Sequence, residues 1–178
     1  MPIVSKDVII TQKYTMKVLA IGDYQEPLKN LILAKKYGNI AAATALGELI
    51  WHMTYVAAIE CDYIIPVPLH WTRFAKRGYN QADEMAYVLS RHKQKPMVQL
   101  LKRIKMTAFQ SSLKHEERLP NVHDAFVLTC KDKEKYQGKH LLIVDDLMTT
   151  GATLHAAARQ LRDLNPASIT AVVACRVV

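Results

Sequence analysis

The 178-residue chain has few cysteines: Cys61, Cys130 and Cys175 lie far apart, with no C-x-x-C pair among them. Their number and spacing argue against a disulfide framework or a zinc ribbon. No apolar run approaches the ~18 residues that a membrane span needs, and no secretory signal pattern opens the chain. The patterns G-x-x-x-x-G-K-[ST] and G-x-G-x-x-G are both missing, which disfavours P-loop and dinucleotide-binding proteins. We therefore expect a cytoplasmic protein without a membrane span.

Length and composition predict one domain, residues 1–178, because half of the residues are hydrophobic and a chain of this size can bury a sizeable core. The formal charge is +8, from 24 Lys and Arg against 16 Asp and Glu. Between residues 91 and 118, eight Lys or Arg residues stand against two Glu. A basic segment attracts polyanions, although a solvated basic face has the same composition.

The most informative stretch is residues 141–153, which reads L-L-I-V-D-D-L-M-T-T-G-A-T. Residues 141–144 are apolar and predict a short buried parallel strand. Asp145 and Asp146 follow, then a Thr/Gly turn, and then apolar residues at the three- and four-residue spacing of a helix. The predicted order is strand, acidic edge, small-residue loop and helix N-terminus.

This order of elements suits a phosphorylated sugar. A helix N-terminus offers unpaired backbone N–H groups, so a phosphate is expected at the loop of Thr149, Thr150, Gly151, Ala152 and Thr153. Asp145 and Asp146 would repel a phosphate. At the end of a strand they suit sugar hydroxyls, or a hydrated Mg²⁺ between the sugar and a second phosphate group.

A second stretch, residues 62–70, reads D-Y-I-I-P-V-P-L-H and predicts a buried strand that ends at its prolines. A basic loop follows, and a helix is expected from about Ala82. Such a loop can hold a pyrophosphate. The candidate residues are Val67, Pro68, Leu69, His70 and Arg77. For Arg77 a solvated surface position is an equal alternative.

These residues carry a resemblance. The apolar run, two acids, three spacers and Thr-Gly-x-Thr resemble the PRPP-binding signature of the type I phosphoribosyltransferases. P-V-P-L-H, followed by R-F-A-K-R-G-Y-N-Q-A, resembles the ComF/GntX family of competence protein F and its relatives, as do residues 24–38 and 110–126. The resemblance implies an α/β fold: a central parallel sheet flanked by helices, a small N-terminal hood within residues 1–38 and a flexible lid loop.

The resemblance also implies ligands. Asp145 and Asp146 would act on the ribose of PRPP and on its Mg²⁺, either directly or through water. Gln110, Arg118 and Asn121 are the lid and acceptor candidates. In purine-salvage enzymes the residue before Thr-Gly is an aspartate, and here it is Thr149, a poor general base at neutral pH. This argues against purine salvage, whereas orotate-type enzymes, which tolerate Thr there, are not excluded.

Three functions are left open by the sequence. The chain transfers phosphoribosyl to an unknown acceptor with release of pyrophosphate, or it is a non-catalytic module that binds PRPP or single-stranded DNA in natural transformation, or it is a subunit with a relic site. Partners in the competence machinery follow from the resemblance alone, and the basic segment has only Phe109 for base stacking. Family members commonly carry an N-terminal four-cysteine zinc ribbon, so the chain is expected to be a short variant or to have lost its start. No residue indicates the oligomeric state.

Overall fold

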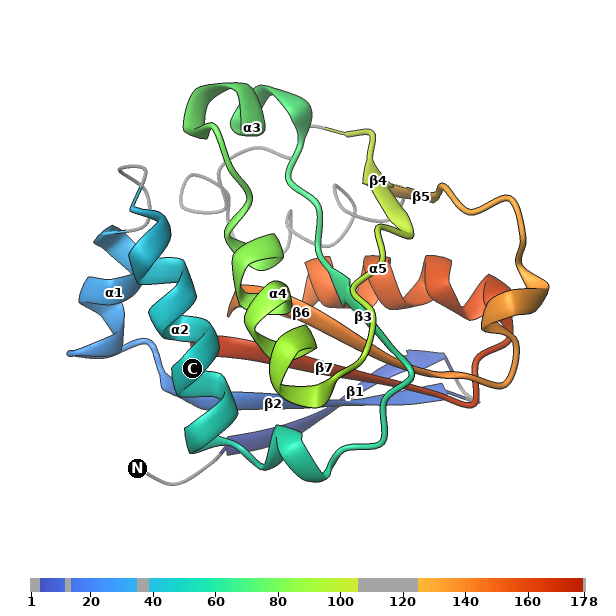
Figure 1. Cartoon of the computed structure of the whole chain (residues 1–178), viewed down its shortest axis with the longest axis horizontal. Coiled ribbons are helices and arrows are strands. Elements are labelled where there is room, and N and C mark those ends of the chain that lie inside the picture. The colour runs from blue at the N-terminus through green and yellow to red at the C-terminus, as the bar shows by residue number, and fades with distance from the viewer. Residues whose placement is uncertain (1–3, 12–13, 35–38, 106–124, 178) are drawn as a thin grey trace.

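The fold is built on a five-stranded sheet, seen in a computed structural model that describes residues 4–11, 14–34, 39–105 and 125–177. The strand order is β1 (Val4–Thr11), β2 (Tyr14–Asp23), β7 (Ser168–Arg176), β6 (His140–Met148) and β3 (Tyr63–Pro66). β1 pairs antiparallel with β2, and the other three pairings are parallel (Figure 1). The central parallel sheet expected from the sequence is therefore confirmed.

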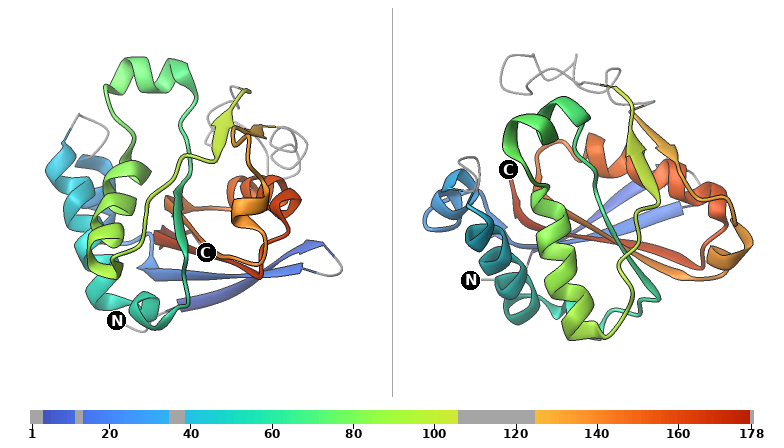
Figure 2. Two further views of the ribbon diagram at one scale, coloured as in Figure 1. Left: turned by 45° about the vertical axis from the view of Figure 1, so that its right-hand side comes forward. Right: turned by 45° about the horizontal axis from the view of Figure 1, so that its top comes forward.

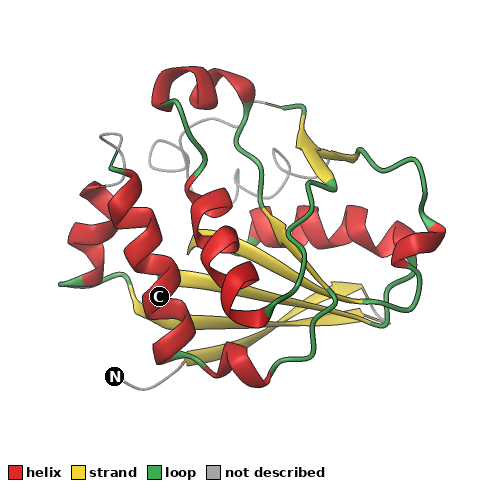
Figure 3. Ribbon diagram, in the orientation of Figure 1, coloured by secondary structure: helices red, strands yellow, loops and turns green. Residues whose placement is uncertain are grey.

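Helices cover both faces of this sheet, as Figure 3 shows. One apolar cluster joins the sheet to α1 (Leu28–Ala34), α2 (Ile40–Met53) and α4 (Gln81–Lys93). The other cluster joins it to α5 (Ala152–Leu161). Within the described part of the chain, none of the helices has both the length and the apolar character that crossing a bilayer requires.

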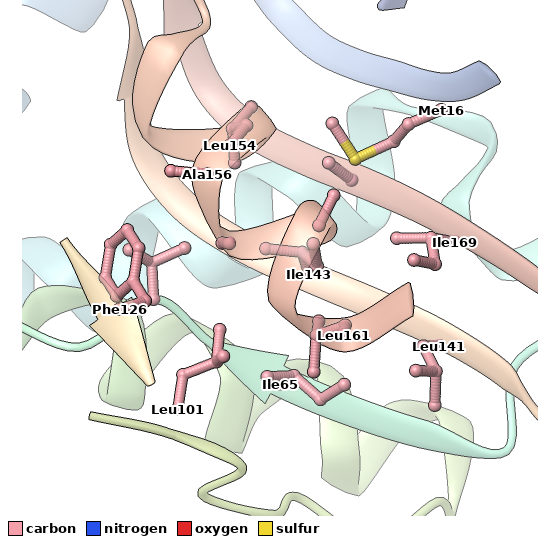
Figure 4. Close-up of a cluster of buried hydrophobic side chains, with 14 of the residues drawn as sticks. Met16, Ile65, Leu101, Phe126, Leu141, Ile143, Leu154, Ala156, Leu161 and Ile169 are labelled. Atoms are coloured by element: carbon pink, nitrogen blue, oxygen red, sulfur yellow. The ribbon is translucent and has the colours of Figure 1, made fainter. Parts of the chain in front are cut away.

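The apolar run of β6 contributes side chains to both apolar clusters. Leu141 and Ile143 face α5, and Leu142 and Val144 face the helices on the other side. Figure 4 shows Ile143 and Leu141 near Leu161 of α5. Strands buried on both faces read as continuous rather than alternating apolar runs, which explains why these residues predicted a buried strand.

The carboxyl ends of the parallel strands lie at one edge of the sheet, and short backbone hydrogen bonds join them. The Val67 amide donates to the Val144 carbonyl at 2.9 Å, which ties the residue after β3 to β6. The Val177 amide donates to the Met148 carbonyl at 2.8 Å, and the Tyr24 amide donates to the Arg176 carbonyl at 2.7 Å. These hydrogen bonds fix the points from which the loops after β3 and β6 start. In open parallel sheets, ligands bind at this edge.

Two further strands, β4 (Leu101–Arg103) and β5 (Phe126–Leu128), form a separate antiparallel pair.

The predicted lid and acceptor residues Gln110, Arg118 and Asn121 lie outside the described residues. Short 3-10 helices occur at Tyr55–Ala58, Glu134–Tyr136 and Arg162–Leu164.

Several boundaries differ from those expected. The strand that was expected to end at Val144 continues to Met148, because β7 keeps pairing with it through Asp145↔Val173 and Met148↔Arg176. The loop after β3 contains a helix, α3 (Trp71–Arg77). Helix α2 ends at Met53, where the Thr54 hydroxyl donates to the Ile50 carbonyl and accepts from the Val56 amide.

The N-terminal segment also differs from the expected hood. Its described residues form β1, β2 and α1, and both strands extend the main sheet. The reason lies in β2, where Val18, Leu19, Ala20 and Ile21 are all buried, so that this strand is covered on both faces. Ahead of β4, one isolated parallel bridge joins Met97 to Ile64 of β3.

Candidate functional site

The acid pair lies near the end of β6. Asp145 and Asp146 are half-buried, and the Asp146 amide donates to the Asp145 carboxylate at 2.8 Å. The charge of Asp146 reaches two tyrosines: burial first and then nearby negative charges, including Asp146, raise the pKa of Tyr24, which follows β2. Burial likewise raises the pKa of Tyr79, with Asp146 a smaller cause. The carboxylates therefore sit among side chains from several elements, at the edge where ligands bind.

The predicted phosphate loop leads into α5, a helix of ten residues. Gly151 is its N-cap, with φ +81° in the left-handed region that glycine adopts without strain. Thr149, Gly151, Ala152 and Thr153 line a hollow of about 20 Å³, which is room for one water-sized group such as a phosphate oxygen. The Thr150 hydroxyl does not line the hollow and instead accepts from the Ala152 amide at 3.4 Å. Four of the five predicted loop residues thus surround one small space at a helix N-terminus.

Two arginines, Arg73 and Arg103, lie within electrostatic reach of the acids, and a third, Arg77, lies near Arg73. Burial lowers the pKa of Arg73, the charge of Arg77 lowers it further, and Asp146 partly offsets both. Burial also lowers the pKa of Arg103, with a further decrease from Arg73 and an offset from Asp145. These guanidinium groups stay protonated in proteins, so cations from α3 and β4 lie within electrostatic reach of both carboxylates. The site is therefore bipolar, with hydroxyl- or metal-binding oxygens on one side and anion-binding guanidinium groups on the other.

Sequence reasoning named Arg77 but not Arg73 or Arg103 as site residues. Arg73 could have been found, since it lies four residues before Arg77 and therefore on the same face of any helix formed there. Arg103 is only 9% exposed, and its guanidinium lies 5.5 Å from the Phe126 ring. Its burial depends on the β4–β5 pairing, which no local pattern indicates.

Two residues of the predicted pyrophosphate loop, Val67 and His70, make hydrogen bonds within the protein. The Val67 carbonyl accepts from the Asn80 side chain at 3.1 Å. The buried His70 uses Nδ1 at the start of α3, at 2.8 Å from the Thr72 hydroxyl. Pro68 and Leu69 line a groove beside α3. Arg77, Pro68 and Leu69 are thus half-buried and lie after β3, beyond the carboxyl edge of the sheet. His70 instead caps the N-terminus of α3.

The R-G-Y-N-Q motif, residues 77–81, holds this loop in place. Asn80 caps α4, where its oxygen accepts from the Ala82 amide at 3.3 Å and its Nδ2 donates to Asp83 at 2.9 Å as well as to Val67. The Tyr79 hydroxyl donates to the Asn39 carbonyl just before α2 at 3.3 Å. Gly78 ends α3 with φ +78°. The motif therefore positions α3 and its arginines relative to the sheet.

The fold and the bipolar edge define a protein of the phosphoribosyltransferase class. A family model described as "Phosphoribosyl transferase domain" matches residues 74–177. The solved "structure of the allosteric regulatory enzyme of purine biosynthesis" matches at a TM-score of 0.51 and 16% identity, over 75% of this chain and 25% of that one. Glutamine phosphoribosylpyrophosphate amidotransferase from B. subtilis matches at 0.50 and 16% identity, over 75% and 26%. These structural likenesses show the fold alone.

Relatives with similar sequences identify the family to which the chain belongs within this class. Competence protein F of Haemophilus influenzae is 34% identical over 158 residues, which cover 83% of this chain and 67% of the relative. The DNA utilization protein YhgH of Escherichia coli K12 is 32% identical over 168 residues, covering 90% and 72%. Competence protein ComFC of Bacillus subtilis is 35% identical over 105 residues, covering 59% and 40%. The chain belongs to the competence protein F (ComF) family of phosphoribosyltransferase-fold proteins.

Proposed function

We propose that the chain binds PRPP together with Mg²⁺ and transfers the phosphoribosyl group to a nitrogen acceptor, with release of pyrophosphate. The observation that carries this proposal is the bipolar edge, where an acid pair leads into a helix N-terminus and arginines approach from α3 and β4. PRPP has the matching chemistry: two phosphorylated ends joined by a sugar with free hydroxyls. A simple phosphate ester would use only one side of this arrangement.

Each group of PRPP then has a place. The 5′-phosphate lies at the hollow lined by Thr149, Gly151, Ala152 and Thr153, where the first turn of α5 directs its backbone amides and the positive end of its dipole. Asp145 and Asp146 accept hydrogen bonds from the ribose hydroxyls. The pyrophosphate faces Arg73, Arg77 and Arg103, whose planar guanidinium groups suit bidentate phosphate contacts.

The donor set also fits Mg²⁺. This ion is commonly held by one or two carboxylates together with substrate phosphates and waters, rather than by a cage made of protein alone. Asp145 and Asp146 supply two carboxylates, and no cluster of three or more His, Cys, Asp or Glu able to hold a metal occurs among the described residues. The ion would neutralise charge on the pyrophosphate, and the two aspartates would hold it directly or through water.

The chemistry asked of the protein is positioning and electrostatics. The bond from C1 of the ribose to the pyrophosphate oxygen breaks, its electron pair leaves with pyrophosphate, and a nitrogen lone pair forms the new bond to C1. The arginines stabilise the charge that grows on the leaving group, and the aspartates hold the ribose as C1 becomes positive. Thr149 is a poor base, so a proton on the acceptor nitrogen passes to water. This favours acceptors other than the purine bases.

We further propose that this activity serves DNA utilisation in the cytoplasm, with single-stranded DNA and the competence machinery as partners. The names of the relatives, competence protein F and DNA utilization protein, support this. The formal charge of +8 favours a polyanionic partner. A second candidate function is a module that binds PRPP or single-stranded DNA without turnover, and it is favoured by an exposed aromatic pair on α3.

Calorimetric titration with PRPP, with and without Mg²⁺, tests the proposal. Asp146→Asn removes one charge at the edge, whereas Asp163→Asn removes one exposed charge beyond the other end of α5. We expect affinity to fall roughly 10- to 150-fold in Asp146→Asn, since hydrogen bonds to charged groups contribute about 1.5–3 kcal/mol, and to stay unchanged in Asp163→Asn. Full retention in Asp146→Asn, or no binding by the wild type, would overturn the site. Binding by the wild type then justifies a screen of nitrogen acceptors for pyrophosphate release.

A further inference from the structure

Helix α3 exposes two aromatic side chains next to the candidate site. Trp71 is 70% exposed and Phe74 is 49% exposed. They are three residues apart on a helix and therefore lie on neighbouring parts of one face. The chain has only two tryptophans and three phenylalanines, so it places one of each in water on the same short helix. Core packing does not account for their position.

The two rings border a groove of about 270 Å³. Pro68 and Leu69 line it with apolar atoms, and the exposed Lys102 and the buried Arg103 of β4 line it as well. Both views in Figure 2 place α3 and β4 on the same side of the molecule. The volume is just below the roughly 300–1,000 Å³ of typical small-molecule sites. The groove therefore has room for one small planar group and not for an element of a protein partner.

One carboxylate also lines the groove. Asp83 accepts hydrogen bonds from the Asn80 side chain at 2.9 Å and from the Gln99 side chain at 2.9 Å. A phosphate would be repelled there, whereas an N–H donor of a base, such as the ring N–H of thymine, would not. The lining of the groove therefore combines aromatic rings and a carboxylate, which suit a base, with Lys102 and Arg103, which suit a phosphate.

We propose that this groove binds an unstacked base of single-stranded DNA, with Trp71 and Phe74 as the stacking platform and Lys102 and Arg103 as backbone contacts. Single-strand binders combine aromatic platforms with cations in this way. A protein partner fits less well, because stable protein interfaces bury about 800 Å² on each side, and this patch has two large exposed apolar residues. Arg103 lines the groove and also lies within electrostatic reach of Arg73 and Asp145, so the strand would pass beside the PRPP site.

This inference rests on the proposed function for its partner, single-stranded DNA, but not for its surface. The test is fluorescence anisotropy with a labelled oligothymidylate of about 15 nucleotides, at ~50 and ~200 mM salt. The variants are Trp71→Ala, Phe74→Ala and Lys102→Gln. Tyr87→Ala is the matched control, because Tyr87 is a 54% exposed aromatic residue on α4 that lines a different hollow. Trp71→Phe keeps an aromatic ring in case the alanine variant is poorly folded.

We expect Trp71→Ala and Phe74→Ala each to weaken binding about 5- to 150-fold without changing the salt slope, because stacking is not ionic. Lys102→Gln should make the negative slope of log affinity against log salt shallower by about 0.7. DNA should quench the tryptophan fluorescence of the wild type, and this quenching should largely disappear in Trp71→Phe, which keeps only the half-buried Trp51. Tyr87→Ala should bind as the wild type does.

Wild-type affinity in both aromatic alanine variants would overturn the stacking platform, and so would undetectable DNA binding by the wild type at low salt. PRPP titration of the same proteins separates this inference from the proposed function. PRPP binding without DNA binding refutes the groove and leaves the PRPP site standing. DNA binding that depends on Trp71, without PRPP binding, does the reverse.

Discussion

The substitution Gly151→Ala tests the phosphate loop through backbone geometry alone. Gly151 is the N-cap of α5, with φ +81° and ψ 0°. An L-residue in the left-handed region costs roughly 1–2 kcal/mol, because Cβ approaches the following carbonyl oxygen. Alanine relieves this cost by shifting the loop out of the left-handed region, and the shift moves the amides that are proposed to hold the phosphate.

Gly138→Ala is the matched control. Gly138 has φ +67°, and a Cβ there would meet no atom within 4 Å. It precedes β6, at the amino end of that strand, while the candidate site lies at the carboxyl end. Both variants should therefore lose roughly 1–2 kcal/mol in the free energy of unfolding. This corresponds to a decrease in Tm of about 2–8 °C for a chain of this length.

PRPP affinity should separate the two variants. For Gly151→Ala we expect a loss of about 10- to 150-fold, the effect of losing one hydrogen bond to a charged group, and for Gly138→Ala no change. Urea unfolding measures the first quantity and calorimetric titration the second. If both variants are destabilised equally and bind PRPP equally well, the loop of residues 149–153 is not the phosphate site.

Two predictions concern the R-G-Y-N-Q region. Asn80→Ala should lower the free energy of unfolding by about 1–3 kcal/mol, because it removes the cap of α4 and leaves the Val67 carbonyl without its side-chain donor; urea unfolding that matches the wild type would show that these hydrogen bonds contribute nothing. Burial raises the pKa of Asp83 above its ordinary value of about 3.9, so between these values the folded protein holds a proton that the unfolded chain has released. The stability of the wild type therefore falls as pH rises through this window, and Asp83→Asn should gain stability relative to it over the same range; a difference that does not vary with pH would contradict this.

The strand and helix around the acid pair could be predicted because their signal is local. The apolar run of β6, the acids and the Thr/Gly turn follow one another directly in the sequence. The end of β6 was misplaced because it depends on pairing with β7 and not on residue type. Ladder partners about thirty residues away are not visible in a local pattern.

Helix α3 and two of the three arginines could not be predicted as easily. The seven residues of α3 expose Trp71 and Phe74, so the helix lacks the buried apolar face that gives periodicity. Arg103 reaches the site through the β4–β5 pair. The R-G-Y-N-Q motif was interpreted as part of a phosphate loop, and its Asn80 and Tyr79 bond to backbone carbonyls that hold the loop in place.

A crystal structure of the chain with PRPP and Mg²⁺ tests the central claim most directly. We predict that the 5′-phosphate lies against the amides of residues 150–153, the ribose hydroxyls against Asp145 and Asp146, and the pyrophosphate against guanidinium groups of α3 and β4. PRPP bound elsewhere, or bound at the edge of the sheet with its phosphates away from both α5 and the arginines, would contradict the account.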